Sequence, residues 1–166
     1  MAAEKILLGY GTFSVGGTPI GLTRGGGSLT IEREFREIEA DGDRGPVKGR
    51  VVIDREVAKL TVNALDMFTS AEMVKYYPAL TNTTGTLEST LASTLEIVAG
   101  DHNDIVWAGK TKDGKTVTIT INDAINMGNI EWNLEDKNEV VPSLEFTATY
   151  AENARNTPPW NIVFEA

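Results

Sequence analysis

The sequence predicts a mainly β protein: an antiparallel β-sandwich or barrel-like domain with one flanking α-helix and a long charged hairpin. Three observations predict this fold class. Short segments of alternating apolar and polar residues dominate the second half of the chain, separated by Gly, Pro, Asn and Asp. One segment has the apolar spacing and capping residues of a helix. A dense charged stretch at residues 25–50 begins with three consecutive glycines.

The charged stretch is predicted to fold as a hairpin over about residues 25–53. Residues 29–39 fit a helix and a strand equally well by their apolar spacing. The glycines before them, the Asp41-Gly42 turn after them and the returning apolar segment favour two antiparallel strands. The apolar phase of the returning strand then shifts, which predicts a β-bulge near Arg55.

A helix is predicted over residues 69–77. Thr69 is a favourable N-cap, and Glu72 three residues later completes a capping box. Pro78 is expected to end the helix because it cannot continue the hydrogen-bond pattern. The apolar stripe that we expect to pack on a sheet consists of Met73, Tyr76 and Tyr77.

The remaining elements are predicted to be strands. Residues 86–98 fit helix and strand periods alike, and their Ser and Thr content favours a strand. An alternating segment from Ile105 leads to a clear strand at 116–122, and Asp113-Gly114 between them predicts a two-residue type I′ turn. Three further alternating segments, with their large apolar residues expected to face inward, are 130–134, 144–150 and 160–164.

Length and composition describe one domain without disulfides. We expect a single domain over residues 1–166, with no additional C-terminal domain. No apolar run approaches the ~20 residues that span a bilayer, and the first ten residues lack a signal-peptide pattern. The absence of cysteine excludes disulfides, thiolate metal sites and cysteine nucleophiles. Synthesis in the cytosol is therefore expected.

No catalytic, cofactor or metal site is predicted, and we expect that the protein is not an enzyme. The single histidine, His102, lies near Asp101 and Asp104, but the spacing of these residues matches no calcium-binding loop. As the one histidine, it is also the one candidate base for a Ser-His-Asp triad, and no hydrolase motif accompanies it. TRGGGS lacks the spacing and the lysine of a phosphate-binding loop. Glu37 and Glu39 are expected to be solvated or ion-paired rather than glycosidase carboxylates.

The charged hairpin is the most informative feature of the sequence. An exposed hairpin offers backbone edges and charge to another chain, and head-to-tail use of two different patches generates rings or filaments. We therefore predict that the hairpin is a subunit interface, hinged on the body at the glycines. The predicted interface residues are Gly25, Gly26, Gly27, Glu32, Glu34, Phe35, Glu37, Glu39, Asp41, Asp43, Arg44, Lys48 and Arg50.

The order of five segments resembles a known family over nearly the whole chain. They are GTPIGLTRGGGSLTIEREFREIEADGDRGPVKG, TVNALDMFTS, TKDGKTVTITINDAINMGNIEW, LEFTATY and TPPWNI. Together they are similar to the major tail tube protein of long-tailed (siphovirus-type) phages and prophages of Gram-positive bacteria. The resemblance implies a β-sandwich tail-tube fold and a structural virion protein, made in the host cytoplasm and located in the tail.

The same resemblance implies an assembly and its partners. Subunits of this family form hexameric rings that stack into a hollow tube, and double-stranded DNA passes through the lumen without specific binding. The implied partners are other copies of the chain, a tape-measure protein, a tail terminator and tail-tip proteins; no cofactor is implied. The net charge of −9 fits an acidic lumen, because like charge prevents the counterion release that drives DNA binding.

Two other functions remain open from the sequence. One is the tube of a phage-derived bacteriocin or secretion device, which would carry no DNA. The other is a monomeric β-sandwich module that binds carbohydrate, with Trp107, Trp132 and Trp160 as stacking platforms. These tryptophans alternate with Ile and Leu, so the pattern favours core packing for them.

Overall fold

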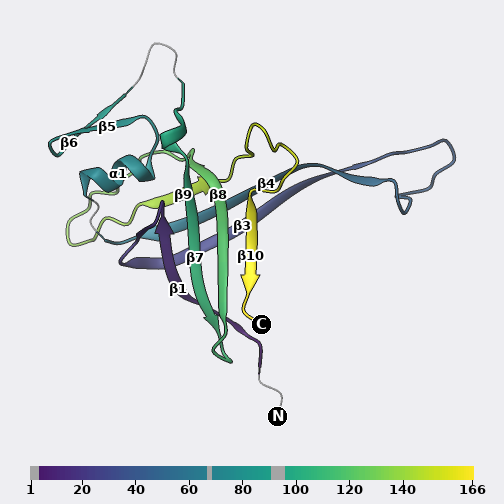
Figure 1. Cartoon of the computed structure of the whole chain (residues 1–166), viewed down its shortest axis with the longest axis horizontal. Coiled ribbons are helices and arrows are strands. Elements are labelled where there is room, and N and C mark those ends of the chain that lie inside the picture. Colours follow the sequence, from purple (N-terminus) through teal and green to yellow (C-terminus); the bar gives the residue numbers. More distant parts are fainter. Residues whose placement is uncertain (1–3, 67–68, 91–95) are drawn as a thin grey trace.

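The computed structural model describes residues 4–66, 69–90 and 96–166, and it confirms a mainly β, antiparallel fold with one α-helix. Figure 1 shows two layers whose strands cross steeply. The order of hydrogen-bonded strands runs from β2 to β3, and these two end strands do not pair with each other, so the strands do not close into a barrel. Sheet A consists of β1 (Leu7–Val15), β2 (Thr18–Pro19), β7 (Asn103–Thr111), β8 (Thr116–Asn126) and β10 (Trp160–Phe164). Sheet B consists of β3 (Thr23–Glu37), β4 (Val51–Ala64), β9 (Ser143–Thr147) and the end of β8.

Strand β8 links the two layers. Its first part pairs with β7 and β10, whereas Ile125 and Asn126 at its end pair with β9 of sheet B. The core lies between the layers because alternate residues of each strand face the other sheet. The largest fully buried side chains on the strands are Val15, Val62, Ile105, Val117, Ile121, Leu144 and Phe146.

Trp107 lies against glycines on the inner face of sheet A. A Cβ added at Gly109 would stand 2.3 Å from its indole, and one at Gly11 would stand 2.5 Å from it. Both distances are shorter than any real carbon contact, so these two positions need glycine to leave room for the ring. The indole is buried, which confirms core packing for this tryptophan.

The helix agrees with its prediction. α1 (Ser70–Tyr76) has Thr69 as its N-cap, and Glu72 completes the capping box. The stripe of Met73, Tyr76 and Tyr77 is buried in the core. A hairpin of β5 (Leu80–Thr83) and β6 (Thr86–Ser89) follows, and η1 (Ala99–Asp101) precedes β7. The strand expected over 86–98 is therefore confirmed only at its start; residues 91–95 lie outside the described residues, and 96–98 are not strand.

The turn between β7 and β8 differs from the predicted type I′ turn. Gly114 has a φ of +88°, but Asp113 is not among the residues with positive φ. The Gly114 N–H donates to the Thr111 carbonyl at 2.9 Å, and the Thr111 N–H donates to the Lys115 carbonyl at 2.9 Å. This is a three-residue loop with glycine in the left-handed position, so the two-residue prediction is wrong.

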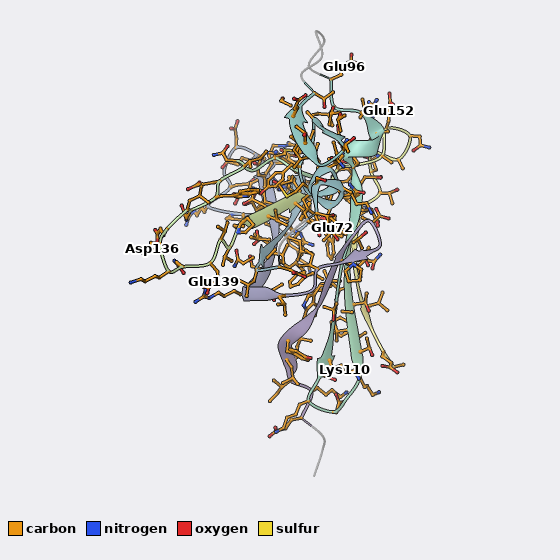
Figure 2. The ribbon with its side chains drawn as sticks, turned by 90° about the vertical axis from the view of Figure 1, so that its left-hand side faces the viewer. Glu72, Glu96, Lys110, Asp136, Glu139 and Glu152 are labelled. Carbon is orange, nitrogen blue, oxygen red and sulfur yellow. The ribbon has the colours of Figure 1, made fainter. Side chains whose placement is uncertain are left out.

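The strand predicted at 130–134 is also wrong. This segment lies in the loop between β8 and β9, and its side chains Ile130, Trp132 and Leu134 are exposed, Leu134 at 79%. Figure 2 shows Asp136 and Glu139 on the same loop, at the side of the molecule. The physical reason is the absence of a neighbour: β8 and β9 already pair with each other, so the crossover between them has no strand to join.

The other late strands are confirmed. β10 has the predicted bounds, and β9 covers the first part of the segment 144–150, with Ala148 buried and Tyr150 half-buried just after it. Within the described residues, the structure contains no helix that could span a lipid bilayer.

Candidate assembly surface

The charged hairpin is confirmed, and its far part stands clear of the sandwich as a two-stranded arm (residues 34–54; Figure 1). Strand β9 pairs with β4 only from Lys59 to Asn63, so nothing in the described chain pairs with the sides of the arm. A lone two-stranded ribbon is marginally stable in water. The arm therefore has the form of an element that another surface supports.

A β-bulge marks the point where the arm leaves the sandwich. Glu34 pairs with Arg55 and Phe35 pairs with Ile53, so Asp54 is an extra residue in β4. This confirms the bulge predicted near Arg55. A bulge bends a strand and increases its local twist, which sets the direction of the arm relative to sheet B.

Ion pairs between β3 and β4 neutralise much of the charge on the hairpin. A pair with two exposed partners is worth ~0.2–1 kcal/mol, whereas Glu56 in the first pair below is only 14% exposed; together the pairs hold the two strands in register. The pairs are Arg33–Glu56 (2.7 Å), Arg36–Asp54 (2.8 Å), Arg55–Glu34 (3.4 Å) and Lys59–Glu32 (3.5 Å). Of the predicted interface residues, Glu32 and Glu34 are thus already paired within the chain.

The tip of the arm has a defined shape. The Asp43 carboxylate accepts hydrogen bonds from the Ala40 N–H at 2.8 Å and from the Arg50 guanidinium at 2.7 Å. The Ile38 N–H donates to the Arg50 carbonyl at 2.8 Å, which closes the tip. None of the ion pairs in the described chain involves the other charged candidates, which are Glu37, Glu39, Asp41, Arg44 and Lys48. These five charges are free to meet a partner.

One face of the arm is apolar. Phe35 pairs with Ile53 and Glu37 pairs with Val51, and residues directly opposite each other share a face. Side chains alternate along a strand, so Phe35, Ile53 and Val51 lie on one face with Glu37. All three apolar side chains are exposed, Phe35 at 62%. Such a patch on an unsupported ribbon makes this face a candidate interaction surface.

The three glycines are not at the base of the arm. The register shifts between Thr23 and Gly27, with φ of +82° at Gly25 and +66° at Gly26, so they form a second bulge at the start of β3. Leu29 and Ile31, between the glycines and the arm, pack against the core. The glycines therefore shape the strand inside the body, and the predicted hinge between body and arm is wrong.

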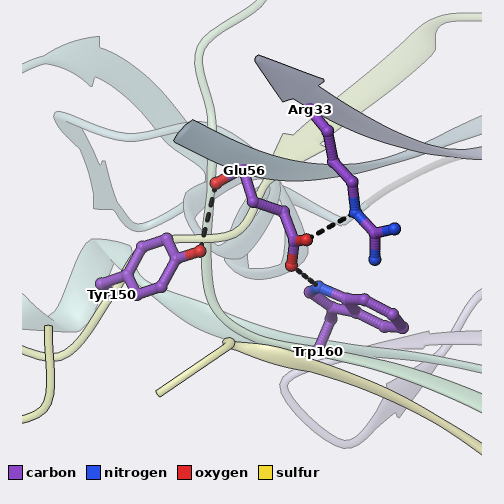
Figure 3. Close-up of polar contacts among 4 residues, drawn as sticks. All are labelled: Arg33, Glu56, Tyr150 and Trp160. Carbon is purple, nitrogen blue, oxygen red and sulfur yellow. Dashed lines mark hydrogen bonds and ion pairs between the residues drawn. The ribbon is translucent and has the colours of Figure 1, made fainter. Parts of the chain in front are cut away.

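Glu56 ties the base of the arm to sheet A (Figure 3). Its carboxylate accepts hydrogen bonds from Trp160 Nε1 and from Arg33 Nε, both at 2.7 Å. These two bonds, first that from Trp160, lower the pKa of the Glu56 carboxyl. The Tyr150 hydroxyl donates to the Glu56 carbonyl at 3.2 Å. One residue of β4 thus joins β3, β10 and the loop before β10.

Sequence reasoning missed this node around Glu56. The hairpin register could have paired Arg33 with Glu56, because the two residues lie directly opposite each other. Nothing in the sequence indicates that Trp160, 104 residues away, donates to the same carboxylate. Trp160 is half-buried and packs against the edge of the core, as its alternating pattern predicts.

Sheet A has two open edges. Strand β2 pairs with Ser14 and Val15, and the Ile20 N–H just after it donates to the Phe13 carbonyl at 2.8 Å. The part of β1 before Phe13 has no strand beside it on that side within the described residues. At the other edge, β10 pairs only with β8. Edge strands with free N–H and C=O groups invite pairing with another chain. Apart from the bond from Ile20, no described segment hydrogen-bonds to either edge.

The face of sheet A that is turned away from sheet B carries little charge. Its register places hydroxyl, amide and small apolar side chains there, and Lys110 lies at one end of it, near the β7–β8 turn (Figure 2). The residues that the register pairs on this face are Thr12, Ser14, Val106, Ala108, Lys110, Thr116, Thr118, Thr120, Asn161 and Val163. Asp104 and Asn122 extend the face by alternation along β7 and β8, so Lys110 and Asp104 balance in charge. The net charge of −9 is therefore carried mainly elsewhere.

The residues considered for chemistry lie apart from one another. Nδ1 of His102, just before β7, lies 3.0 Å from the Asp123 carbonyl, whereas Glu37 and Glu39 are on the arm. Within the described residues, no three His, Asp or Glu side chains are grouped so that they could hold a metal ion. A hollow of about 880 Å³ is an open groove lined by β4, β9 and the loop at 150–158.

No model of a known protein family matches the chain, and a search of curated proteins also finds no match. The arm, the node at its base and the open edges of sheet A are therefore the features on which a function must rest.

Proposed function

We propose that this chain is a tail tube protein, a structural subunit that assembles with copies of itself into stacked hexameric rings around a hollow channel. The arm is the observation that carries this proposal. It is a preformed ribbon with an uncovered apolar face, free charges at its tip and no partner within the described chain. An element of this kind is stable when it lies on a neighbouring subunit.

The open edges of sheet A support closure into a ring. If β10 of one copy pairs with β1 of the next, the sheets join into one continuous barrel and every edge of sheet A disappears. The contact is heterologous, because the two edges are different surfaces. Repetition of a heterologous contact closes into a ring when the rotation allows it.

The face of sheet A turned away from sheet B suits the wall of a channel for DNA. Hydroxyl and amide groups dominate this face, and a lumen lined by it would offer few cations to phosphate groups. Counterion release would then drive little binding, and a duplex could slide. The sequence predicts a lumen that is net acidic or neutral, and the surface that we assign to it is close to neutral.

The partners follow from the same proposal. A tape-measure protein would occupy the channel during assembly, a terminator and tip proteins would cap the ends, and the assembled protein would be located in the virion tail. A bacteriocin or secretion tube would use the same surfaces without DNA. A carbohydrate-binding module is less well supported, because Trp107 is buried and Trp160 is bound to Glu56, which leaves one exposed tryptophan among the three.

Size-exclusion chromatography with negative-stain microscopy tests the proposal. The purified protein is expected to form rings and hollow tubes when it is concentrated or seeded with preformed tubes. Compact monomers at every concentration, with no rings or tubes after seeding, would contradict the proposal. Tubes that copurify with no capsid components but exclude a short duplex would favour the bacteriocin or secretion device.

A further inference from the structure

The two edge strands of sheet A run in opposite directions. Each neighbouring pair in the series β1, β7, β8 and β10 is antiparallel, so β10 points against β1, as the arrows in Figure 1 show. In a ring, rotation about the central axis keeps the direction of every strand relative to that axis. If β10 of one copy lies beside β1 of the next, the two strands are therefore antiparallel. An antiparallel pair is also slightly more stable per residue than a parallel one.

Strand β10 has one row of free backbone groups. The Asn122 N–H donates to the Pro159 carbonyl at 2.7 Å, and the Glu165 N–H donates to the Thr116 carbonyl at 2.9 Å. The odd-numbered residues therefore face β8, because backbone groups alternate between the two sides of a strand. The residues whose N–H and C=O groups face the open side are Trp160, Ile162 and Phe164.

The open side of β1 is shorter than the strand itself. The Lys112 N–H donates to the Ile6 carbonyl at 2.8 Å, so even-numbered residues face β7 and odd-numbered residues face away from it. From Phe13 onwards the outward side is engaged by the Ile20 N–H and by β2. The outward-facing residues of β1 that remain open are Leu7, Gly9 and Gly11.

The open residues of both strands place their side chains on the inner face of sheet A. One row across the four strands consists of Phe164, Val117, Gly109 and Gly11. Val117 is buried in the core, so this row lies on the inner face. Between Gly11 and Leu7, β1 takes four steps where β7 takes two. The difference is even, so Leu7 lies on the same face, and it lines one hollow of about 390 Å³ together with Phe164.

Most registers between the two edges are blocked. Without a shift, Phe164 of one copy would lie opposite Gly11 of the next, and Trp160 would meet Val15, which β2 already holds. A shift of two residues would place Trp160 opposite Phe13, whose carbonyl already accepts a hydrogen bond. A shift by an odd number would bring the inner face of one sheet against the outer face of the next.

We propose that β10 of one copy pairs with β1 of the next copy at a shift of four residues. This is the register in which all of β10 meets open residues of β1. The inference rests on the proposed ring and names the residues that meet in it. The opposite pairs are Phe164–Leu7, Ile162–Gly9 and Trp160–Gly11.

Two physical arguments support this register. Phe164 is 67% exposed and Leu7 is 46% exposed, so their contact removes apolar surface of both copies from water. Closure makes a demand of its own, because a sheet closes into a barrel only when its strands tilt and its two edges meet with a stagger. The part of β1 that β2 covers therefore excludes the unstaggered contact, and the part that it leaves open permits a staggered one.

Disulfide trapping reads the register directly, because the chain contains no cysteine. At a shift of four residues, Val163 lies opposite Leu8 in a pair without hydrogen bonds, where Cα atoms stand about 4.5 Å apart and fit a disulfide. Val163→Cys, carrying a size tag, is mixed under reducing conditions with Leu8→Cys, Tyr10→Cys or Thr12→Cys. Each mixture is then assembled and oxidised mildly. All four positions are exposed, so none of the substitutions opens a cavity in the core.

The three mixtures report three registers. Thr12→Cys reports the contact without a shift, Tyr10→Cys a shift of two residues and Leu8→Cys a shift of four. A disulfide-linked heterodimer is expected with Leu8→Cys, at a yield at least tenfold above that of either other mixture. Random collision would instead favour Tyr10, which is 86% exposed against 43% for Leu8. A highest yield with Tyr10→Cys or Thr12→Cys, equal yields in all three mixtures, or no heterodimer at all would overturn the inference.

The same experiment separates this inference from the proposed function. Tubes that form while the cross-link reports another register would leave the tube proposal standing and remove the shift of four residues. A specific cross-link between Leu8→Cys and Val163→Cys in copies that never form rings or tubes would support the strand contact and contradict the tube.

Discussion

The Trp160 indole donates a 2.7 Å hydrogen bond to the Glu56 carboxylate, so the last strand of sheet A holds the base of the arm in sheet B. The acceptor side chain is only 14% exposed. Trp160→Phe keeps an aromatic ring and removes the donor. We expect this substitution to lower the free energy of unfolding by about 1–2 kcal/mol, because the lost hydrogen bond is made to a charged, partly buried carboxylate. Glu34→Gln is the matched control: it weakens an ion pair at 3.4 Å between two side chains that are each 67% exposed. The free energy of unfolding of this variant, measured by thermal denaturation, should stay within about 0.5 kcal/mol of the wild-type value.

The stability of the fold should depend on pH through the ionisation of Glu56. The hydrogen bonds from Trp160 and Arg33 lower the pKa of Glu56 from its ordinary value of 4.5. A lowered pKa in the folded state means that the ionised group stabilises the fold above pH 4.5 and that this contribution is lost as the pH falls through the folded value. Glu56→Gln lacks this titration. The difference in melting temperature between wild type and variant should therefore shrink between pH 7 and pH 3. A constant difference across that range would show that the carboxylate does not stabilise the node.

Gly27 should resist substitution for a steric reason. A Cβ at this position would stand 2.1 Å from the Thr61 carbonyl oxygen and 2.8 Å from the Phe13 ring. Gly27→Ala is expected to cost about 1–3 kcal/mol, the range typical of overpacking. Gly45→Ala is the control, because no atom lies within 4 Å of its Cβ position. Equal denaturation midpoints for the two variants would mean that the strand relaxes freely around the bulge.

The arm should be dispensable for folding and required for assembly. Replacement of residues 37–48 by a short Gly-Ser linker removes mostly exposed side chains. A cooperative melt close to that of the wild type is expected, together with the loss of tubes in negative stain. A more conservative pair of variants is Phe35→Ser, which should block assembly, and Leu134→Ser, which should not. If the deletion variant fails to fold, the arm belongs to the structural core of the protein.

Because the face of sheet A that is turned away from sheet B is close to neutral, assembled tubes should bind duplex DNA weakly. Wild-type tubes assembled with a short duplex are expected to protect little of it from nuclease, even at low salt, where attraction is strongest. Thr118→Lys/Thr120→Lys adds two cations to this face and should increase protection in a salt-sensitive way. Asn129→Lys/Asn133→Lys adds the same charge to the loop between β8 and β9. If this control protects DNA equally well, the face of sheet A does not line the channel.

Local signals in the sequence predicted the elements that depend on local physics. The capping box at Thr69 and Glu72 determines where the helix begins, and the phase shift near Arg55 reports the bulge, because each signal acts within a few residues. The segment 130–134 has an equally good strand pattern but no strand beside it. Strand formation depends on a neighbour as well as on a pattern, and the neighbour is a property of the whole fold.

The candidate interface was predictable in outline and not in detail. Phe35 and the free charges at the tip are exposed as the charged hairpin predicts, whereas Glu32 and Glu34 are occupied by partners across the hairpin. The two edges of sheet A and the link from Trp160 to Glu56 join residues far apart in the chain. Their positions follow from strand order, which no short segment encodes.

The hydrogen-bonded tip and the ion pairs across the hairpin order the arm before it meets a partner, which should affect the rate of assembly. A segment that becomes ordered only on contact loses conformational entropy at that moment, whereas this ribbon has already lost it during folding. Such preorganisation favours rapid capture of each new subunit once a first ring exists. Salt should then act twice on growth: it screens attraction between copies, and it loosens the exposed pairs such as Arg36–Asp54 that keep the ribbon straight before it meets a partner.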